Sequence, residues 1–170
     1  RVDHTVVGRL RDAMGAITDA ARRRGVAARV VPTLVQGEAA TVGAALAREL
    51  LQSHASGLIV WGGETTVTLP PEPGRGGRNQ ALALSAAIAL AGNANCYVLA
   101  AGTDGSDGPT EDAGALVDGG TLERGRMHGL DAAECLRRAD AGTFLAASGD
   151  LIQTGPTGTN VMDVLLGLRC

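Results

Sequence analysis

The chain has 170 residues, which is enough for one domain with a substantial apolar core. All 15 of its basic residues are arginine, so a Walker-type phosphate-binding loop and a Schiff-base lysine enzyme are both excluded. The net charge of -3 and the 2% content of aromatic residues argue against a surface for duplex nucleic acid and against base stacking on single strands. We therefore expect no nucleic-acid partner.

The apolar and cysteine patterns indicate the compartment. No apolar run approaches the roughly 18 residues that a membrane span needs, so no membrane partner is expected. Cys96, Cys135 and Cys170 are odd in number and form no CxxC pair, which favours neither a disulfide framework nor a zinc site. Reduced thiols in a cytoplasmic protein are the expectation. The start at Arg1, without Met or a signal-like region, suggests a piece of a longer protein.

The first half of the sequence predicts helices that alternate with short strands. Apolar residues at helical spacing predict helices over residues 5–24 and 37–52. A short strand is expected over residues 26–31. The continuous apolar run at 57–61 is typical of a strand buried on both faces, as in a parallel sheet. Residues 65–69 alternate β-branched side chains and could pair beside that run.

The second half continues this alternation. Residues 79–91 are apolar nearly all round, which predicts a well-buried helix. A buried strand over 96–101 precedes a loop rich in glycine and aspartate at 102–110. The remaining expected elements are helices over 131–138 and 144–147 and strands over 151–154 and 164–168. The pattern predicts an α/β fold over residues 1–170, a layered domain with a mainly parallel or mixed sheet flanked by helices.

The polar residues of chemical interest cluster at expected strand ends, where the ligands of α/β proteins gather. The first cluster is the motif GGETT at 62–66. Glu64 could bind a hydroxyl or a metal, and Thr65 and Thr66 could donate to an anion. The alternative is a glycine-rich turn in which Glu64 is solvated.

The second cluster is GRGGRNQ at 74–80, at the entrance to the predicted helix over 79–91. Its glycines allow close approach of a ligand, and free N–H groups at a helix N-terminus attract anions. Arg78 adds a planar fork of donors that suits a carboxylate or phosphate. An arginine at this end opposes the helix dipole, so its placement favours an anionic partner. The alternative is a flexible surface loop.

The third cluster combines GTDGSDGPT at 102–110 with TGPTGTN at 154–160. Asp104 and Asp107 could hold Mg²⁺ through oxygen, as phosphoryl-transfer sites require. The alternative is Asx-turn chemistry, in which each aspartate bonds its own backbone. These two hypotheses stay open.

Other catalytic motifs are missing from the sequence. His4, His54 and His128 have no metal-ligand spacing such as HExxH. A serine-hydrolase elbow GxSxG is absent, and so is GxGxxG in a strand–helix context. These absences weaken hydrolase and dinucleotide-binding hypotheses.

Four strings in one order resemble a known family. They are GGETTVTL at 62–69, GRGGRNQ at 74–80, AAGTDGSDGPT at 100–110 and GDLIQTGPTGTNVMD at 149–163. They are similar to the C-terminal MOFRL region of class II glycerate kinases, some of which are also named hydroxypyruvate reductases. Residues 1–55, with QGEA at 36–39, resemble the segment before that region. The resemblance implies that 1–55 lead into a MOFRL-like region at 56–170, within the C-terminal part of a two-domain protein.

The resemblance implies an activity and its site. The family transfers a phosphoryl group from ATP to the 2-hydroxyl of D-glycerate, with Mg²⁺, in the cytoplasm and in a cleft between two domains. The N-terminal domain of the family carries a lysine thought to act there, so this chain alone is expected to be inactive; a homodimer is compatible with this picture. By motif position, Arg78 is the anion-binding catalytic arginine. The other expected binding residues are Glu64, Thr65, Thr66, Asn79, Asp104, Asp107, Thr157 and Asn160, with Asp104 and Asp107 as metal ligands.

The sequence departs from the family pattern at three places. Leu10 follows Arg9 where members often have Asn, Ala81 stands where Glu often follows the Gln of GGRNQ, and Met162 replaces the second Asn of GTNVND. These departures leave the substrate open. The alternatives are a hydroxypyruvate reductase using NAD(P)H and a non-catalytic ligand-binding or oligomerisation domain.

Overall fold

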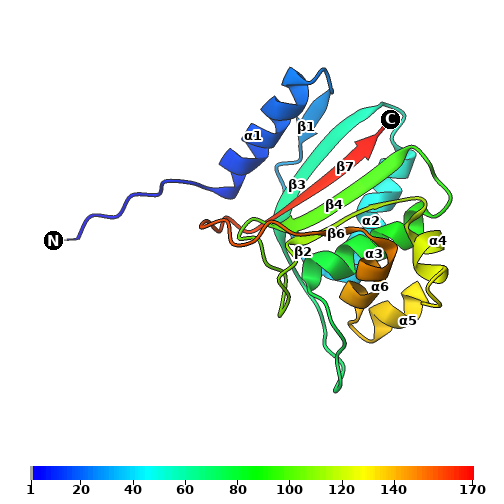
Figure 1. The fold of residues 1–170 in the computed structure, drawn as a ribbon. Coiled ribbons are helices and arrows are strands. Elements are labelled where there is room, and N and C mark those ends of the chain that lie inside the picture. Colours follow the sequence, from blue (N-terminus) through cyan, green and yellow to red (C-terminus); the bar gives the residue numbers. More distant parts are fainter. Residues whose placement is uncertain (1) are drawn as a thin grey trace.

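The apolar run that begins at Gly57 forms a long strand inside a mixed sheet with helices on both faces (Figure 1). This computed structural model describes residues 2–170. The strands are β1 (Ala28–Val30), β2 (Val35–Glu38), β3 (Gly57–Thr66), β4 (Cys96–Gly102), β5 (Gly114–Asp118), β6 (Leu151–Ile152) and β7 (Asp163–Arg169). The helices are α1 (Leu10–Arg23), α2 (Ala39–Gln52), α3 (Arg78–Leu90), α4 (Thr121–Arg126), α5 (Ala132–Arg137) and α6 (Ala141–Ser148). The expected α/β fold is confirmed.

The sheet order explains where the loops meet. The strands lie in the order β1-β3-β7-β4-β5-β6, and β2 also pairs with β3. β1 and β2 run parallel to β3, whereas β7 lies antiparallel between β3 and β4. β3 and β4 therefore end at the edge of the sheet where β7 begins. This arrangement brings the polar motifs that follow β3 and β4 together with the first residue of β7.

The helices form two unequal layers. α2 and α3 cover one face of the sheet, and α5 and α6 pack against α3 from the outside (Figure 1). Most residues of α3 are buried, which accounts for its apolar character on nearly every side. α1 lies on the opposite face, over β1 and β3. Its Leu10 and Met14 form a small second core with Val60.

The motif GGETT at 62–66 lies inside β3 and not in a turn, which corrects the expected end of that strand at residue 61. Its glycines serve close packing on both faces of the strand. A Cβ on Gly62 would come within 2.9 Å of Leu10 and Met14, and a Cβ on Gly63 would overlap the backbone of Val35. Both glycines thus make room for neighbouring elements and do not mark a chain reversal.

Several shorter elements differ from the sequence prediction. The first helix begins at Leu10 and not at residue 5. The second begins at Ala39 and not at residue 37, because residues 35–38 form β2 beside the end of β3. β5 and α4 were not predicted, and the short helix expected at 144–147 is part of α6. In residues 2–170, no helix is both long enough and apolar enough to cross a membrane.

Gly167 of β7 packs against the ring of Trp61, so a substitution at this position tests how tightly the core is packed. A Cβ at position 167 would lie 2.7 Å from the Trp61 ring. We expect Gly167→Ala to lower the free energy of unfolding by about 1–3 kcal/mol, the usual cost of overpacking a core. Gly15 in α1 is the control, because nothing lies within 4 Å of a Cβ there. Gly15→Ala should raise stability by about 0.5–1 kcal/mol in the same urea titration; equal effects of the two variants would contradict this packing.

Candidate functional site

Arg78 lies at the centre of the candidate site, held by two carboxylates. Its Nε and Nη2 donate to Asp163 Oδ2 and Oδ1 at 2.6 and 3.0 Å, a bidentate pair. Its Nη1 lies 3.3 Å from Glu64 Oε1. The Asp163 side chain is only 3% exposed, whereas those of Arg78 and Glu64 are 35% and 52% exposed. The hydrogen bond to Asp163 raises the pKa of Arg78 above its usual value, more than burial lowers it.

Sequence reasoning missed Asp163. The residue is the last of the string GDLIQTGPTGTNVMD, but no spacing rule separated it from its neighbours. In the sheet it lies opposite Gly63 on one side and Gly102 on the other. The glycines serve close approach of other segments: a Cβ on Gly63 would overlap the backbone of Val35, and a Cβ on Gly102 would lie 2.5 Å from Ser106 O. One signal could have pointed to such a residue: an arginine at a helix N-terminus opposes the helix dipole, so Arg78 was expected to have an anionic partner.

Asp107 occupies the N-terminus of α3. Its Oδ1 accepts from the backbone N and the side-chain Nδ2 of Asn79 at 3.0 and 3.3 Å, and its Oδ2 accepts from Gln80 N at 2.8 Å. Burial raises the pKa of Asp107, and the two backbone N–H donors oppose that shift. The backbone N–H groups of Asn79 and Gln80 are therefore not free for a ligand, which corrects the expectation of an open anion site there.

Asp104 links the two halves of the third cluster. Its Oδ1 accepts from the backbone and hydroxyl of Ser106 at 3.0 and 3.2 Å, the local bonding of an Asx turn. Its Oδ2 accepts from Asn160 Nδ2 at 3.2 Å. Thr157 donates from its backbone to Asp104 O and from its hydroxyl to Thr103 O, at 3.1 and 2.5 Å. The structure thus brings Asp104, Thr157 and Asn160 together.

The predicted magnesium ligands do not form a metal centre by themselves. Both oxygens of Asp107 accept hydrogen bonds from α3, and its side chain is buried. Among residues 2–170, no group of three or more His, Cys, Asp or Glu side chains is placed to hold a metal ion. Asp104, in contrast, is partly exposed.

Thr65, Thr66 and Asn79 are not equally available to a ligand. Thr66 is exposed and donates to Gly37 O of β2 at 3.3 Å. Thr65 Oγ1 and Asn79 Oδ1 are buried and have no hydrogen-bond partner in the part of the chain that the structure describes, as is also true of Gln80 Oε1. Buried polar atoms of this kind are expected to bind ordered water.

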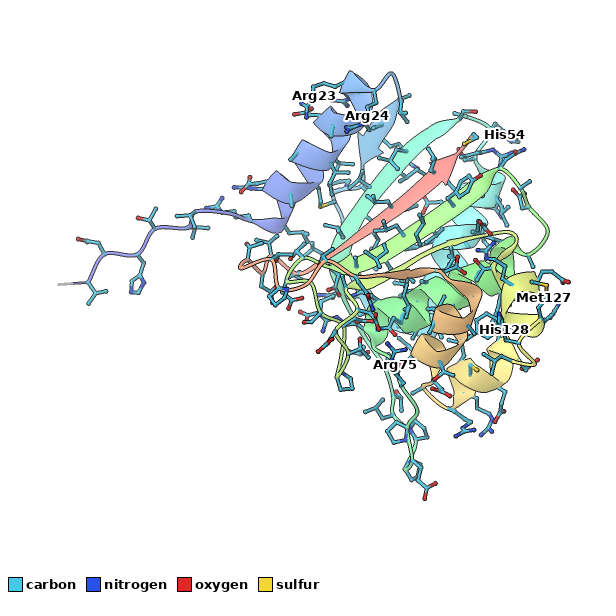
Figure 2. The ribbon with its side chains drawn as sticks, in the orientation of Figure 1. Arg23, Arg24, His54, Arg75, Met127 and His128 are labelled. Atoms are coloured by element: carbon cyan, nitrogen blue, oxygen red, sulfur yellow. The ribbon has the colours of Figure 1, made fainter. Side chains whose placement is uncertain are left out.

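Arg75, the other arginine of the GRGGRNQ motif, has a structural role. It contacts the fully buried carboxylate of Asp112 through Nη2, and its backbone N donates to Asp140 at 2.8 Å. Figure 2 shows Arg75 at the root of the extended arm of residues 67–77, beside α6. His54 and His128 lie elsewhere, after α2 and after α4. The histidines therefore do not contribute to the loop cluster around Arg78.

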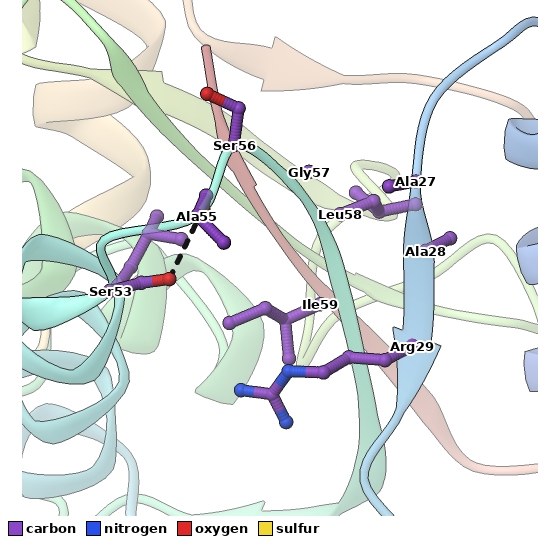
Figure 3. Close-up of a pocket in the computed structure, with 10 residues that line it drawn as sticks. Ala27, Ala28, Arg29, Ser53, Ala55, Ser56, Gly57, Leu58 and Ile59 are labelled. Carbon is purple, nitrogen blue, oxygen red and sulfur yellow. Dashed lines mark hydrogen bonds between the residues drawn. The ribbon is translucent and has the colours of Figure 1, made fainter.

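Two hollows differ in their relation to these loops. One of about 490 Å³ lies against the loops, lined by residues 104–106, 110, 111, 153, 155 and 156. The other, of about 210 Å³, lies between β1 and the start of β3 (Figure 3). Arg29 at its rim is paired with Glu49 at 3.0 Å. The second hollow is at the opposite end of β3 from Glu64, so it is separate from the candidate site.

Met162 sets the direction in which Asp163 enters the sheet. Its φ of 74° is in the left-handed region that residues other than glycine rarely adopt. Its carbonyl accepts from the backbone N and the hydroxyl of Thr103 at 3.1 and 2.7 Å. Its side chain packs against the small core under α1. Asn adopts this conformation at lower cost than Met, which gives a physical meaning to the departure at this position.

Comparison with known proteins places these motifs in a family. The model described as "MOFRL family" matches residues 57–163, which include Glu64, Arg78, Asp107 and Asp163. The chain belongs to the MOFRL family. It is 39% identical to a D-glycerate 2-kinase of Thermotoga maritima over 98% of this chain, and 36% identical to a glycerate 2-kinase of Pyrococcus horikoshii over 90%. It is also 38% identical to a putative hydroxypyruvate reductase of Agrobacterium vitis over 89%.

Solved structures give the same relationship in three dimensions. A glycerate kinase of Thermotoga maritima superposes on 99% of this chain with a TM-score of 0.94 and 37% identity. The chain covers 42% of that protein and 36% of the Pyrococcus kinase, so it spans about two fifths of the relatives it matches. It is homologous to the C-terminal region of glycerate 2-kinases. The MOFRL region with its lead-in segment is thus one part of the relatives' architecture.

Removal of the Asp107 carboxylate should destabilise the protein. Asp107→Ala leaves the N–H groups of Asn79 and Gln80 without their buried acceptor, at a cost of about 1–3 kcal/mol in urea unfolding. Asp131 is the control, because it caps α5 through a single bond to Glu134 N at 2.8 Å and is exposed. Asp131→Ala should cost only about 1 kcal/mol. A smaller loss at Asp107 than at Asp131 would contradict the role of Asp107 as a buried acceptor.

The backbone strain at Met162 is measurable with two truncations. Met162→Gly and Met162→Ala both remove the side chain, but only glycine adopts a φ of 74° without steric cost. We expect the glycine variant to unfold at higher urea concentration, by about 1–2 kcal/mol in free energy. An alanine variant as stable as the glycine variant would show that the turn relaxes at no cost.

Proposed function

We propose that this chain forms one wall of the active site of a glycerate 2-kinase. The reaction is transfer of a phosphoryl group from ATP to the 2-hydroxyl of D-glycerate, in a cleft between this domain and an N-terminal domain. On this proposal, residues 1–170 are the C-terminal domain of a two-domain cytoplasmic enzyme. The relatives named D-glycerate 2-kinase and glycerate 2-kinase, which align with 98% and 90% of this chain, support it.

The observation that carries the proposal is the fixed but exposed guanidinium of Arg78. Asp163 binds one edge of the guanidinium through two hydrogen bonds, so the fork cannot rotate freely. On the other side Nη1 contacts Glu64, which is itself 52% exposed, and the Arg78 side chain is 35% exposed. Both substrates of a glycerate kinase are anions, and a fixed arginine fork matches the oxygens of a carboxylate or a phosphate. Phosphoryl transfer depends mainly on such positioning and on charge stabilisation.

The loops around Arg78 would provide the rest of the wall. Asp104 is hydrogen-bonded to both Thr157 and Asn160 and borders the 490 Å³ hollow, which suits polar contacts to a hydroxy acid or a nucleotide. Mg²⁺ commonly binds through one or two carboxylates together with substrate phosphates. Asp104 fits that use better than Asp107, because Asp104 is partly exposed whereas Asp107 is buried with both oxygens bonded to α3. When bound, the ion would neutralise charge on the phosphates.

The chain contains no lysine, so its own cations are all arginine. Any ammonium group that contacts the phosphates would have to come from the N-terminal domain. This chain alone would then bind substrate weakly and would not catalyse transfer. We propose that the complete active site forms only when the two domains face each other.

A second candidate function is reduction of hydroxypyruvate with NAD(P)H. It is favoured only by two relatives from Agrobacterium vitis, each of which is named a putative hydroxypyruvate reductase. The chain lacks a glycine fingerprint for a dinucleotide after a strand. The kinase proposal therefore accounts for more of the site.

The test uses the complete protein that carries this chain. We expect D-glycerate and Mg-ATP to give ADP and 2-phosphoglycerate, measured by coupled ADP release and by ³¹P NMR of the product. Consumption of NADH or NADPH on hydroxypyruvate, with no ADP release on D-glycerate, would contradict the kinase proposal and support the reductase.

Substitution of Arg78 should lower activity far more than stability. Arg78→Ala is expected to lower kcat/KM by about 100-fold or more, the scale of losing one preorganised donor. Arg75→Ala is the matched control, because Arg75 also pairs with a buried aspartate of the same loop cluster. Both variants remove the arginine partner of a buried carboxylate and should lower stability, although Asp112 keeps a hydrogen bond from Gln153 Nε2 at 2.8 Å. Similar kcat/KM for the two variants would remove Arg78 from the site.

A further inference from the structure

The two carboxylates that contact Arg78 differ in their burial, in their distance from the guanidinium and in the number of hydrogen bonds they accept from it. Asp163 is buried, comes from the centre of the sheet and makes two short hydrogen bonds, at 2.6 and 3.0 Å. Glu64 is 52% exposed, and its Oε1 approaches Nη1 at the longer distance of 3.3 Å. A buried bidentate partner is costly to remove, whereas an exposed ion pair contributes little. Only Glu64 can leave Arg78 at low cost.

The position of Glu64 on β3 gives it room to move. β7 begins at Asp163, opposite Gly63, so β3 has no β7 partner from Glu64 onward. On its other side, Glu64 is held only through the backbone register with Gln36 of β2. The side chain can therefore rotate into solvent without disturbing the sheet.

The charge balance explains why Glu64 has to move when an anion arrives. Arg78, Asp163 and Glu64 together carry a net charge of about -1, and Asp107 adds further negative potential. An oxyanion would be repelled from this group as long as Glu64 remains. With Glu64 turned away, Arg78 and Asp163 are neutral together, and the Nη1 and Nη2 donors that do not face Asp163 are free for two oxygens.

We propose that Glu64 is a displaceable counter-ion that stands in the oxyanion subsite of Arg78. The ligand is a carboxylate or phosphate group with two oxygens matched to the guanidinium fork. Asp163 holds the fork in place, and Glu64 sets the affinity by competing for the same nitrogen. This inference rests on the proposed kinase function, in which the oxyanion is either the carboxylate of D-glycerate or a phosphate of ATP.

The test compares Glu64→Gln with the unaltered complete protein. The glutamine is isosteric and uncharged, and the site is exposed, so the fold is expected to be retained. We expect the KM for the substrate that binds Arg78 to fall about two- to fivefold, the scale of a half-exposed ion pair. A fall in the KM for D-glycerate identifies the carboxylate, and a fall in the KM for ATP identifies a phosphate.

A matched control separates the contact between Glu64 and Arg78 from the general effect of removing one negative charge. Glu123→Gln removes one charge from an exposed position on α4, outside the loops around Arg78. It should leave both KM values within about 1.5-fold of the unaltered protein, because an exposed charge that does not contact the ligand is largely screened. Equal falls in KM for Glu64→Gln and Glu123→Gln would overturn the displacement and leave only a field effect.

A binding measurement without turnover completes the test. D-Glycerate alone and ATP alone are titrated against thermal unfolding, since a ligand that binds the native state raises Tm. The ligand at Arg78 should raise Tm at lower concentration in Glu64→Gln than in the unaltered protein. Unchanged KM and unchanged midpoints in an enzyme that phosphorylates D-glycerate would overturn the role of Glu64 and leave the proposed function intact. Absence of transfer by the unaltered protein would overturn the proposed function itself.

Discussion

The ion pair between Arg78 and Asp163 is the contact on which the arrangement of the loops depends. Asp163 is the first residue of β7 and pairs with Gly63 of β3 on one side and Gly102 of β4 on the other. Its side chain is buried at this end of the sheet. A buried carboxylate needs hydrogen-bond donors or a paired cation. Arg78 supplies it from the first residue of α3. One interaction therefore joins three strands to the helix that fills the core.

The residues around this pair serve mainly to keep it in place. Asp107 caps α3 and so fixes the helix that carries Arg78. The strained turn at Met162 directs Asp163 into the sheet, and its carbonyl is held by Thr103. These contacts arise from segments that are distant in sequence. The result is a guanidinium fixed along one edge by Asp163 and in contact with only an exposed carboxylate, Glu64, at Nη1, which is the type of preorganisation that anion recognition requires.

Sequence patterns predicted the elements whose burial is uniform. The apolar run at 57–61 and the apolar helix at 79–91 were predicted because both are buried on nearly every side. β2, β5 and α4 were missed because they are short and have no clear period. The motif at 62–66 was placed in a turn because glycines usually indicate one. In β3 they instead allow α1 and β2 to approach closely.

Only part of the site was predicted, because motifs indicate residues of interest but not their contacts with distant segments. Arg78, Asp104, Thr157 and Asn160 were selected from their motifs, and the structure brings them to one edge of the sheet. Asp107 was selected as a ligand, but its two oxygens bind the helix N-terminus. Asp163 has no local signature, since its role depends on a pairing with Arg78, which is distant in sequence. Pairings across a sheet cannot be read from spacing along one strand.

The most direct test of the account is a crystal structure of the complete protein with D-glycerate and a non-hydrolysable ATP analogue bound. The account predicts a ligand carboxylate or phosphate with oxygens about 3 Å from the terminal nitrogens of Arg78. In that structure the Arg78–Asp163 pair should be intact and Glu64 should have turned toward solvent. Both ligands bound away from Arg78, with the Arg78–Glu64 contact unchanged, would contradict it.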